Sequence, residues 1–263
     1  MSQSPSRSES KGKLYVVGTG PGDVGLLTPQ ARQAIRIADV VLGHKLYLDL
    51  VRDELEGKEV ISSGMGREVE RAREALRLAK ERTVTLVSGG DAGVYGMASI
   101  VLELAEREEP GIEVEVVPGI TAASAAAARL GAPLSGDFVV ISLSDLLTPW
   151  EEVERRLDLA FEMKVPVAMY NPRSRGRSGN LAKALAIALK HLSPQTPVGV
   201  VRNAYRPQEC VFITTLGQLC EDDGMVDMHC TVIIGGENSR IWKEGNHVKG
   251  IITPRGYHRK YVY

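Results

Sequence analysis

The stretch Lys13-Leu-Tyr-Val-Val-Gly-Thr-Gly-Pro-Gly-Asp23 decides the fold. Its first five residues, rich in apolar and β-branched side chains, predict a short strand, and the glycines and proline that follow predict a tight turn. Thr28–Ile37 then has helical spacing, with Pro29 in the first turn, where a helix tolerates proline. A strand, a glycine-rich turn and a helix in this order are typical of an α/β fold.

The same alternation continues toward the middle of the chain. Strands are predicted at Val40–Leu42, Val60–Ile61, Thr83–Val87 and Glu113–Val117, and helices at Arg67–Lys80, Met97–Glu106 and Ala122–Leu130. Strands that alternate with helices predict a largely parallel sheet with helices on its faces. The cluster Gly131-Ala-Pro-Leu-Ser-Gly136 interrupts this pattern, so we place the end of an N-terminal α/β lobe, residues 13–135, there.

A second α/β lobe is predicted over residues 136–240. Its strands are expected at Phe138–Ser142, Val165–Tyr170, Val198–Arg202, Cys210–Thr214 and Thr231–Ile234, and its helices near Glu151–Phe161 and Leu181–His191. The strands at 198–202 and 210–214 leave no room for a helix between them, which predicts an antiparallel pair. Residues 241–263 form an aromatic, basic tail without clear periodicity, and the polar, Ser-rich residues 1–12 are expected to be a disordered leader.

Composition narrows the class of protein. The chain has 263 residues, 43% of them apolar and 25% charged, which is typical of a globular protein of two lobes. The net charge of −1 argues against a nucleic-acid partner. No run approaches the roughly 20 apolar residues of a membrane-spanning helix, so no membrane partner is expected. The three cysteines lack a C-x-x-C pair, which predicts reduced, buried thiols in a cytoplasmic protein.

The first glycine-rich turn resembles a dinucleotide-binding loop only in part. Its glycines fit the first half of G-x-G-x-x-G, but Asp23 stands where the last glycine belongs. A carboxylate at that position would repel a pyrophosphate, so nicotinamide binding is disfavoured. A tight structural turn and a ligand-binding loop both remain open for this segment.

Two further turns favour a zwitterionic ligand. Gly89-Gly-Asp-Ala-Gly-Val-Tyr-Gly96 follows a buried strand, and Asp91 there could meet a cation or sugar hydroxyls, or could cap a helix. Pro118–Ser124 leads into an Ala-rich helix whose free N–H groups suit a carboxylate, although close helix packing explains the alanines equally well. Together the two turns suit a free amino acid or S-adenosylmethionine.

Several motifs carry a resemblance to a known family. They are, in chain order, Val17-Gly-Thr-Gly-Pro-Gly-Asp23, Ser88-Gly-Gly-Asp91 with Val94-Tyr-Gly96, Val117-Pro-Gly-Ile-Thr-Ala122 and Leu130-Gly-Ala-Pro-Leu134. In this order, over about residues 13–236, they resemble the tetrapyrrole methylase family, whose members use S-adenosylmethionine. The resemblance implies two α/β lobes with mixed, mostly parallel sheets, a cofactor cleft between the lobes, and a homodimer.

One stretch is more discriminating within that family. Together with Ser63–Glu68, Tyr170–Ser174 and Val201–Ala204, Ile141-Ser-Leu-Ser-Asp-Leu-Leu-Thr-Pro-Trp150 is similar to the precorrin-3B C17-methyltransferases of cobalamin biosynthesis. This implies methyl transfer to C17 of precorrin-3B, or of cobalt-factor III in the anaerobic route, with ring contraction. S-adenosylhomocysteine would be the second product, and cobalt would be present only if the substrate carries it.

The resemblance also implies site residues. The expected cofactor contacts are Pro21, Gly89, Gly90, Asp91, Val94, Thr121, Ala122, Tyr170, Asn171 and Ala204. Because the tetrapyrrole carries carboxylate arms, arginines in or beside the motif loops are expected to bind it: Arg67, Arg71, Arg173, Arg175 and Arg202.

Catalytic groups are less clearly marked. Ser144, Asp145 and Glu68 are candidate acids or bases for ring contraction, although capping of a following helix explains Ser144 and Asp145 equally well. The histidines show no metal-ligand spacing, so no protein metal site is expected. Alternative functions are a C11 methylase of the same pathway, an RNA 2′-O-methyltransferase and a non-catalytic sensor of an adenosyl ligand.

Overall fold

The computed structural model describes residues 12–173 and 179–262. The chain divides into two compact units between Thr121 and Ala122. The expected leader, apart from Gly12, and Arg175 lie outside the described residues. Within the described ranges, no helix has the length and apolar character that crossing a bilayer requires.

The first unit contains a five-stranded parallel sheet. Its strands are β1 (Lys13–Gly18), β2 (Val40–His44), β3 (Glu59–Ser63), β4 (Thr83–Ser88) and β5 (Glu113–Val117), in the order β3-β2-β4-β1-β5. All four pairings are parallel, with β1 in register between β4 and β5. The carboxyl ends of all five strands therefore lie at one edge of the sheet.

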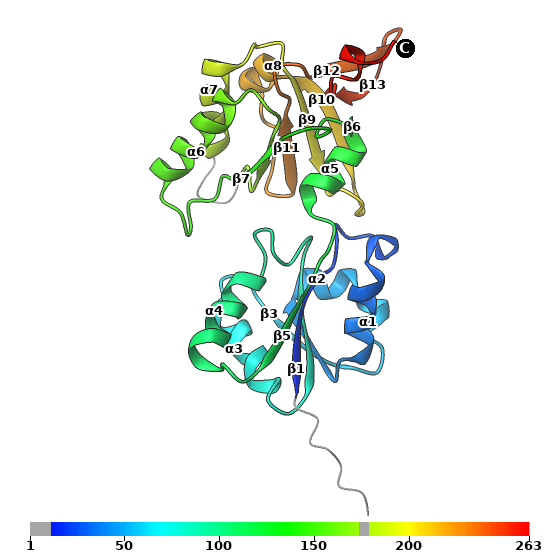
Figure 1. Ribbon diagram of the computed structural model, residues 1–263, viewed down its shortest axis with the longest axis vertical. Coiled ribbons are helices and arrows are strands. Elements are labelled where there is room, and N and C mark those ends of the chain that lie inside the picture. The colour runs from blue at the N-terminus through cyan, green and yellow to red at the C-terminus, as the bar shows by residue number, and fades with distance from the viewer. Residues whose placement is uncertain (1–11, 174–178, 263) are drawn as a thin grey trace, which may run out of the picture. The chain divides into compact units, whose positions relative to one another are not determined.

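Helices cover both faces of this sheet (Figure 1). They are α1 (Pro29–Ile37), α2 (Lys45–Leu50), α3 (Glu68–Leu78) and α4 (Ala98–Glu108), with 3-10 turns at Val24–Leu26 and Arg52–Leu55. Alternate residues of β1 face opposite ways, so that Val16 packs with α3 and α4, whereas Val17 packs with α1 and α2. Thr28 caps α1 by accepting from the Ala31 N–H at 3.1 Å, directly before Pro29.

The second unit contains a mixed sheet. Its strands are β7 (Val139–Ser142), β8 (Val167–Tyr170), β9 (Pro197–Arg202), β10 (Cys210–Thr215) and β11 (Cys230–Ile234), in the order β10-β9-β11-β8-β7. β7 and β8 are parallel, and β11 runs antiparallel between β8 and β9. β9 and β10 form the antiparallel pair expected from their short connection. Together the two sheets confirm the predicted α/β class with mixed, mostly parallel sheets.

The helices of the second unit explain where the chain divides. α6 (Trp150–Glu162), α7 (Asn180–His191) and α8 (Leu216–Glu221) pack on one face of the sheet, and α5 (Ala122–Leu130) packs on the other. Leu130 of α5 lies so close to Gly199 that a Cβ there would be 2.3 Å from a Leu130 methyl carbon. Because α5 is buried against the second sheet, the division falls before this helix, whereas the sequence pattern placed the lobe boundary after it.

The C-terminal segment also contains strands. β12 (Arg240–Glu244) and β13 (His247–Ile252) form an antiparallel hairpin, β13 pairs with the short β6 (Gly131–Ala132), and a 3-10 turn follows at Tyr257–Arg259. The register shifts between Trp242 and Lys243, and this bulge breaks the alternation that would mark a strand in the sequence.

Candidate functional site

Three loops meet at the carboxyl edge of the first sheet. They follow β1, β4 and β5, three neighbouring strands, and their glycines touch. A Cβ on Gly119 would lie 2.2 Å from the carbonyl oxygen of Gly90, and one on Gly18 would lie 2.7 Å from the same atom. Only glycine permits backbone segments to approach this closely, so this edge is formed mainly by backbone.

Hydrogen bonds join these loops into one assembly. Gly20 and Gly90 exchange reciprocal N–H to carbonyl bonds, both 2.9 Å long. Asp91 accepts from the Gly93 N–H at 2.8 Å through Oδ1 and from the Gly119 N–H at 2.9 Å through Oδ2. Helix α4 has Met97 at its N-cap. Asp91 therefore does not cap α4 but connects the second loop to the third.

The remaining cofactor candidates of the first unit lie in the same loops. Pro21 follows the Gly20 bridge, Gly89 and Val94 flank Asp91, and Thr121 ends the loop after β5. The ring of Tyr47 packs on Gly89, where a Cβ would come within 2.2 Å of a ring carbon. The structure therefore brings these candidates to one edge of one sheet.

The other predicted residues lie at one edge of the second sheet. β7, β8 and β9 end at this edge and β10 and β11 begin there, because the latter two run antiparallel to β9. The loops at this edge carry Ser144 and Asp145 after β7, Asn171 and Arg173 after β8, and Ala204 after β9.

Unusual backbone conformations are frequent in the loops at the two sheet edges just described. Non-glycine residues with positive φ among the described residues include Tyr95 after β4, Asn171 after β8, and Asn203, Tyr205 and Gln208 after β9. Left-handed backbone costs free energy for residues that carry a Cβ, and such residues cluster at functional sites. Sequence reasoning missed this signal because asparagine alone suggests only a turn.

Two side chains fix the geometry around the end of β8. The hydroxyl oxygen of Tyr170 accepts from the Ala123 N–H at 2.6 Å, which connects β8 to the start of α5 beside Ala122. Asn171 donates through Nδ2 to Ser142 Oγ at 2.9 Å, and the same Oγ accepts from the Ser144 N–H at 3.2 Å. The predicted cofactor residues Ala122, Tyr170 and Asn171 thus belong to one hydrogen-bonded region of the second unit.

The catalytic candidates fall in different units. Ser144 and Asp145 precede α6, but the N-cap of that helix is Pro149, so the capping explanation of these two residues is wrong. Glu68 begins α3 in the first unit and accepts from the Gly66 N–H at 3.1 Å. The chemistry of all three residues stays a prediction.

The structure separates the predicted substrate arginines into different environments. Arg67 is exposed and pairs with Glu70 at 2.6 Å. Arg71 has a side chain only 4% exposed, contacts Glu68 at 3.6 Å, and has no partner for Nε and Nη1 among the described residues. Arg173 pairs with Asp223 and donates to the Val226 carbonyl at 3.3 Å.

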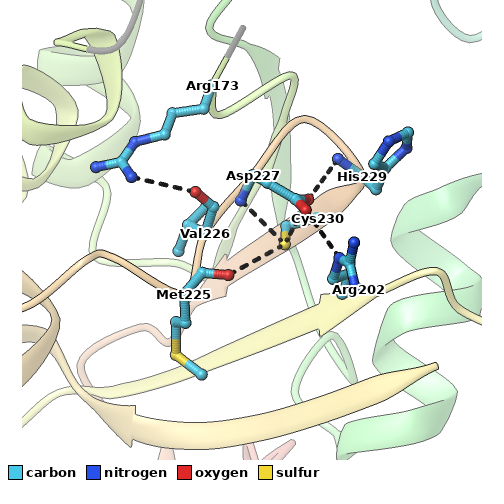
Figure 2. A network of polar contacts seen from close by, with 7 residues as sticks. All are labelled: Arg173, Arg202, Met225, Val226, Asp227, His229 and Cys230. Carbon is cyan, nitrogen blue, oxygen red and sulfur yellow. Dashed lines mark hydrogen bonds and ion pairs between the residues drawn. The ribbon is translucent and has the colours of Figure 1, made fainter. Parts of the chain in front are cut away.

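Arg202, at the end of β9, belongs to a compact polar network (Figure 2). Its Nε donates to Asp227 Oδ2 at 2.8 Å, while Asp227 Oδ1 accepts from the His229 N–H at 2.8 Å and from the Cys230 thiol at 3.4 Å. Burial would raise the pKa of Asp227, but these hydrogen bonds and the charge of Arg202 outweigh it and hold that pKa below its usual value. Burial raises the pKa of the Cys230 thiol to about 11.

The cysteines differ from the sequence prediction in one respect. All three are free, as expected, but only Cys230 is buried, whereas Cys210 and Cys220 are exposed. The prediction of buried thiols is therefore wrong for two of them. Both exposed thiols lie near the ends of short elements, and the sequence alone does not indicate which side chains of such elements are buried.

The described residues contain no cluster of three His, Cys, Asp or Glu side chains that could hold a metal ion. His44, at the end of β2, accepts from the Leu46 N–H at 3.2 Å through Nδ1 and thereby caps α2. This bond uses the lone pair of Nδ1 and therefore places the proton of a neutral ring on Nε2.

The chain matches one protein family and several named relatives. Residues 13–220 match the family of tetrapyrrole (corrin/porphyrin) methylases. The chain is 46% identical to a probable cobalt-factor III C(17)-methyltransferase of Salmonella typhimurium, over 93% of this chain and 99% of that protein. It is 41% identical to a precorrin-3B C(17)-methyltransferase of Sinorhizobium sp, over 94% and 97% of the two chains. A cobalt-factor III methyltransferase of Priestia megaterium is 43% identical over 96% of this chain, which spans 46% of that relative.

Solved structures agree with these matches. The crystal structure of the methyltransferase CobJ has a TM-score of 0.84 and 34% identity, and the match covers 92% of this chain and all (100%) of that chain. A uroporphyrin-III C-methyltransferase from Thermus thermophilus complexed with S-adenosylhomocysteine has a TM-score of 0.64 and 28% identity, over 85% and 92% of the two chains. The family match and these structural matches each cover most of the chain. The chain therefore belongs to the tetrapyrrole (corrin/porphyrin) methylase family.

Proposed function

We propose that this protein transfers a methyl group from S-adenosylmethionine to C17 of precorrin-3B or of its cobalt-bearing counterpart, cobalt-factor III, with contraction of the macrocycle. The observation that carries the proposal is the near full-length match to the Salmonella protein named for this reaction, at 46% identity. The match to CobJ, a methyltransferase, over all of that chain supports the same reaction type.

The glycine-rich edge of the first unit fits the cofactor. An adenosyl sulfonium with an amino-acid end needs close approach to backbone N–H and carbonyl groups, and Gly18, Gly90 and Gly119 provide backbone without side chains. A related structure contains the demethylated product, S-adenosylhomocysteine. We assign Pro21, Gly89, Gly90, Asp91, Val94 and Thr121 of this unit, and Ala122, Tyr170, Asn171 and Ala204 of the other, to cofactor binding.

The chain's own contribution to the reaction is mainly positioning. S-adenosylmethionine supplies a methyl group that is already electrophilic because its sulfur is positively charged, so no protein nucleophile is required. Holding two reactants in line in a water-poor site can supply as much as about 7–11 kcal/mol. Asp91 contributes by fixing two loops against each other, and Ser144, Asp145 and Glu68 are assigned to the proton transfers of ring contraction.

A product analysis tests this function. The full-length protein is incubated with S-adenosylmethionine carrying an isotopically labelled methyl group, and with precorrin-3B or cobalt-factor III, and the labelled carbon is located by nuclear magnetic resonance. A label at C17 of a contracted ring is expected. A label at C11 would identify a different methylase of the pathway, and cofactor binding without any methyl transfer would identify a sensor.

Replacement of Asp91 tests the cofactor assignment. Asp91→Ala removes both bonds that join the second and third loops, so we expect a loss of about tenfold or more in affinity for S-adenosylhomocysteine, measured by calorimetric titration. Asp222→Ala is the matched control, because Asp222 makes the same local bond to Gly224 and has no second partner among the described residues. Equal affinity of the Asp91 and Asp222 variants would contradict the assignment.

The proposal includes the working state of the enzyme. We expect a homodimer in the cytoplasm. Light scattering of the purified protein measures the oligomeric state, and a monomer at working concentration would contradict that part of the proposal.

A further inference from the structure

We propose that Asp227 is a positioning residue of the substrate site: its carboxylate orients Arg202 so that the two terminal nitrogens of the guanidinium receive a carboxylate arm of the tetrapyrrole. The inference rests on the proposed function and deepens it. It concerns only the edge of the second sheet where β9 ends and β11 begins.

Only one nitrogen of the Arg202 guanidinium has a partner among the described residues. Its Nε donates to Asp227 Oδ2 at 2.8 Å, and within the described ranges no partner occupies Nη1 or Nη2. Its side chain is 36% exposed, so these nitrogens can meet a ligand from solvent. The two terminal N–H groups of a guanidinium form a fork that matches the two oxygens of a carboxylate. Arg202 also lies two residues before Ala204, at the edge that carries the predicted cofactor residues.

Asp227 is itself held from two directions. The His229 N–H donates to Oδ1 at 2.8 Å, and the Cys230 thiol lies 3.4 Å from the same oxygen. The Asp227 N–H in turn donates to Cys230 Sγ at 3.4 Å (Figure 2). Because His229 and Cys230 hold Oδ1, the Asp227 carboxylate, just before β11, is fixed and sets the direction in which Arg202 points. The lowered pKa keeps Asp227 ionised at neutral pH.

Arg173 in the same region has a different role. It pairs with Asp223, donates through Nη1 to the Val226 carbonyl, and its Nε is buried without a partner among the described residues. These contacts hold the segment 222–229 that carries Asp227 and leave Arg173 without a free, exposed fork. Of Arg173 and Arg202, Arg202 is therefore the one placed to bind an anion.

Removal of the Asp227 charge distinguishes a residue that orients Arg202 from a nearby negative charge that only repels the substrate. If Asp227 were only a nearby negative charge, Asp227→Asn would remove a repulsion and tighten binding of the polyanionic tetrapyrrole. If Asp227 positions Arg202, the same change weakens binding, because the amide cannot hold the guanidinium equally well. The two explanations therefore predict opposite signs.

The test measures binding of cobalt-factor III to the full-length protein by absorbance titration, with S-adenosylhomocysteine present so that no turnover occurs. We expect the Kd to rise about tenfold in Asp227→Asn and in Arg202→Gln, and to rise little further in the double variant, because both changes disable one contact. Asp222→Asn removes a charge from the same segment outside the network and should leave the Kd unchanged. Affinity for S-adenosylhomocysteine should stay at the wild-type value in all four proteins.

Each outcome decides the proposal. An unchanged or lower Kd in Asp227→Asn overturns the positioning role, and an unchanged Kd in Arg202→Gln overturns the anion contact. If Asp227→Asn fails to fold, Cys230→Ala removes one donor to Asp227 and should raise the Kd two- to threefold, by about 0.5 kcal/mol; no change would count against the proposal. Wild-type protein that binds the tetrapyrrole but does not methylate it would refute the proposed function while leaving this contact testable by affinity.

Discussion

The carboxyl edge of the first sheet is built from backbone, whereas the corresponding edge of the second sheet is built from charged side chains. At the first edge, glycines approach so closely that a single added carbon would overlap a carbonyl. At the second, Arg202 and Arg173 are paired with Asp227 and Asp223, and several non-glycine residues have positive φ. The corresponding edges of the two sheets thus differ in what they offer to a ligand.

This difference teaches how a chain can bind two unlike small molecules. Backbone amides and carbonyls are fixed dipoles of both signs, and they suit a zwitterionic cofactor. A substrate with several carboxylates needs full positive charges, and those charges need counterions to keep their orientation when no substrate is bound. The first edge is therefore expected to be sensitive to added volume and the second to changes of charge.

The largest effect is expected for Gly119→Ala. The new Cβ would lie 2.2 Å from the Gly90 carbonyl oxygen, so the two loops must separate. We expect the free energy of unfolding in urea to fall by about 3 kcal/mol and calorimetric cofactor binding to be lost. Gly111→Ala, where an added Cβ would meet no described atom within 4 Å beyond its chain neighbours, should change stability by less than about 0.5 kcal/mol. Normal cofactor affinity in Gly119→Ala would break the comparison.

Arg71→Met tests a buried charge of the first unit. The buried guanidinium has two nitrogens without partners in the described ranges, so an apolar chain of similar length should raise the free energy of unfolding by about 1–4 kcal/mol. Methyl transfer should fall if Arg71 serves the substrate. Arg67→Met removes an exposed ion pair and should leave stability nearly unchanged. A strong destabilisation of Arg71→Met would reveal an unrecognised partner.

Tyr170→Phe tests a hydrogen bond at the edge of the second sheet. It removes the hydroxyl that accepts from the Ala123 N–H at the start of α5, which should lower the free energy of unfolding by about 1 kcal/mol. The matched change Tyr15→Phe removes a hydroxyl for which no hydrogen bond is found in the described ranges and should have a smaller effect. Equal thermal stability of the two variants would show that the Tyr170 bond contributes nothing.

The smallest effect at neutral pH concerns the titration of a buried thiol. The pKa of Cys230 is about 11 in the folded protein because the thiol is buried, above the value of about 8.5 in an unfolded chain. The folded state therefore keeps its proton longer, and this contribution to stability is complete below about pH 8.5 and declines as pH rises toward 11. The free energy of unfolding should fall less steeply with rising alkaline pH in Cys230→Ala than in Cys210→Ala. The Cys210 thiol is exposed, so its removal serves as the control. Parallel pH profiles would contradict this.

Local patterns predicted most of the fold. The strand Lys13–Val17, the helix that starts at Pro29 and the antiparallel pair of β9 and β10 follow from spacing and turn residues alone. The hairpin of β12 and β13 was missed, although Gly245-Asn246 between two short strands is a usual signal of a two-residue turn. The placement of β11 between β8 and β9 depends on contacts far apart in sequence, which periodicity does not report.

One part of the candidate site could be predicted from the sequence, and another part could not. The glycine-rich loops could be located from the sequence because glycine and proline mark turns at strand ends. The partners of the arginines could not, since Arg202 and Asp227 are 25 residues apart and Arg173 and Asp223 are 50 apart. Their pairing depends on strand order and register, and many aspartates were equally plausible from spacing alone. The alternative of Asp91 as a helix cap was likewise wrong, because its bond to the Gly119 N–H in a third loop leaves no local pattern in the sequence.

The reciprocal amide bonds between Gly20 and Gly90 have a practical consequence for enzyme engineering. A chimera that borrows residues 18–22 alone from another methylase would place foreign donors and acceptors opposite a native Gly90, with Gly119 pressed against the same carbonyl. Exchange of these loop sequences between relatives therefore requires that three segments, 18–22, 89–93 and 118–121, are moved together.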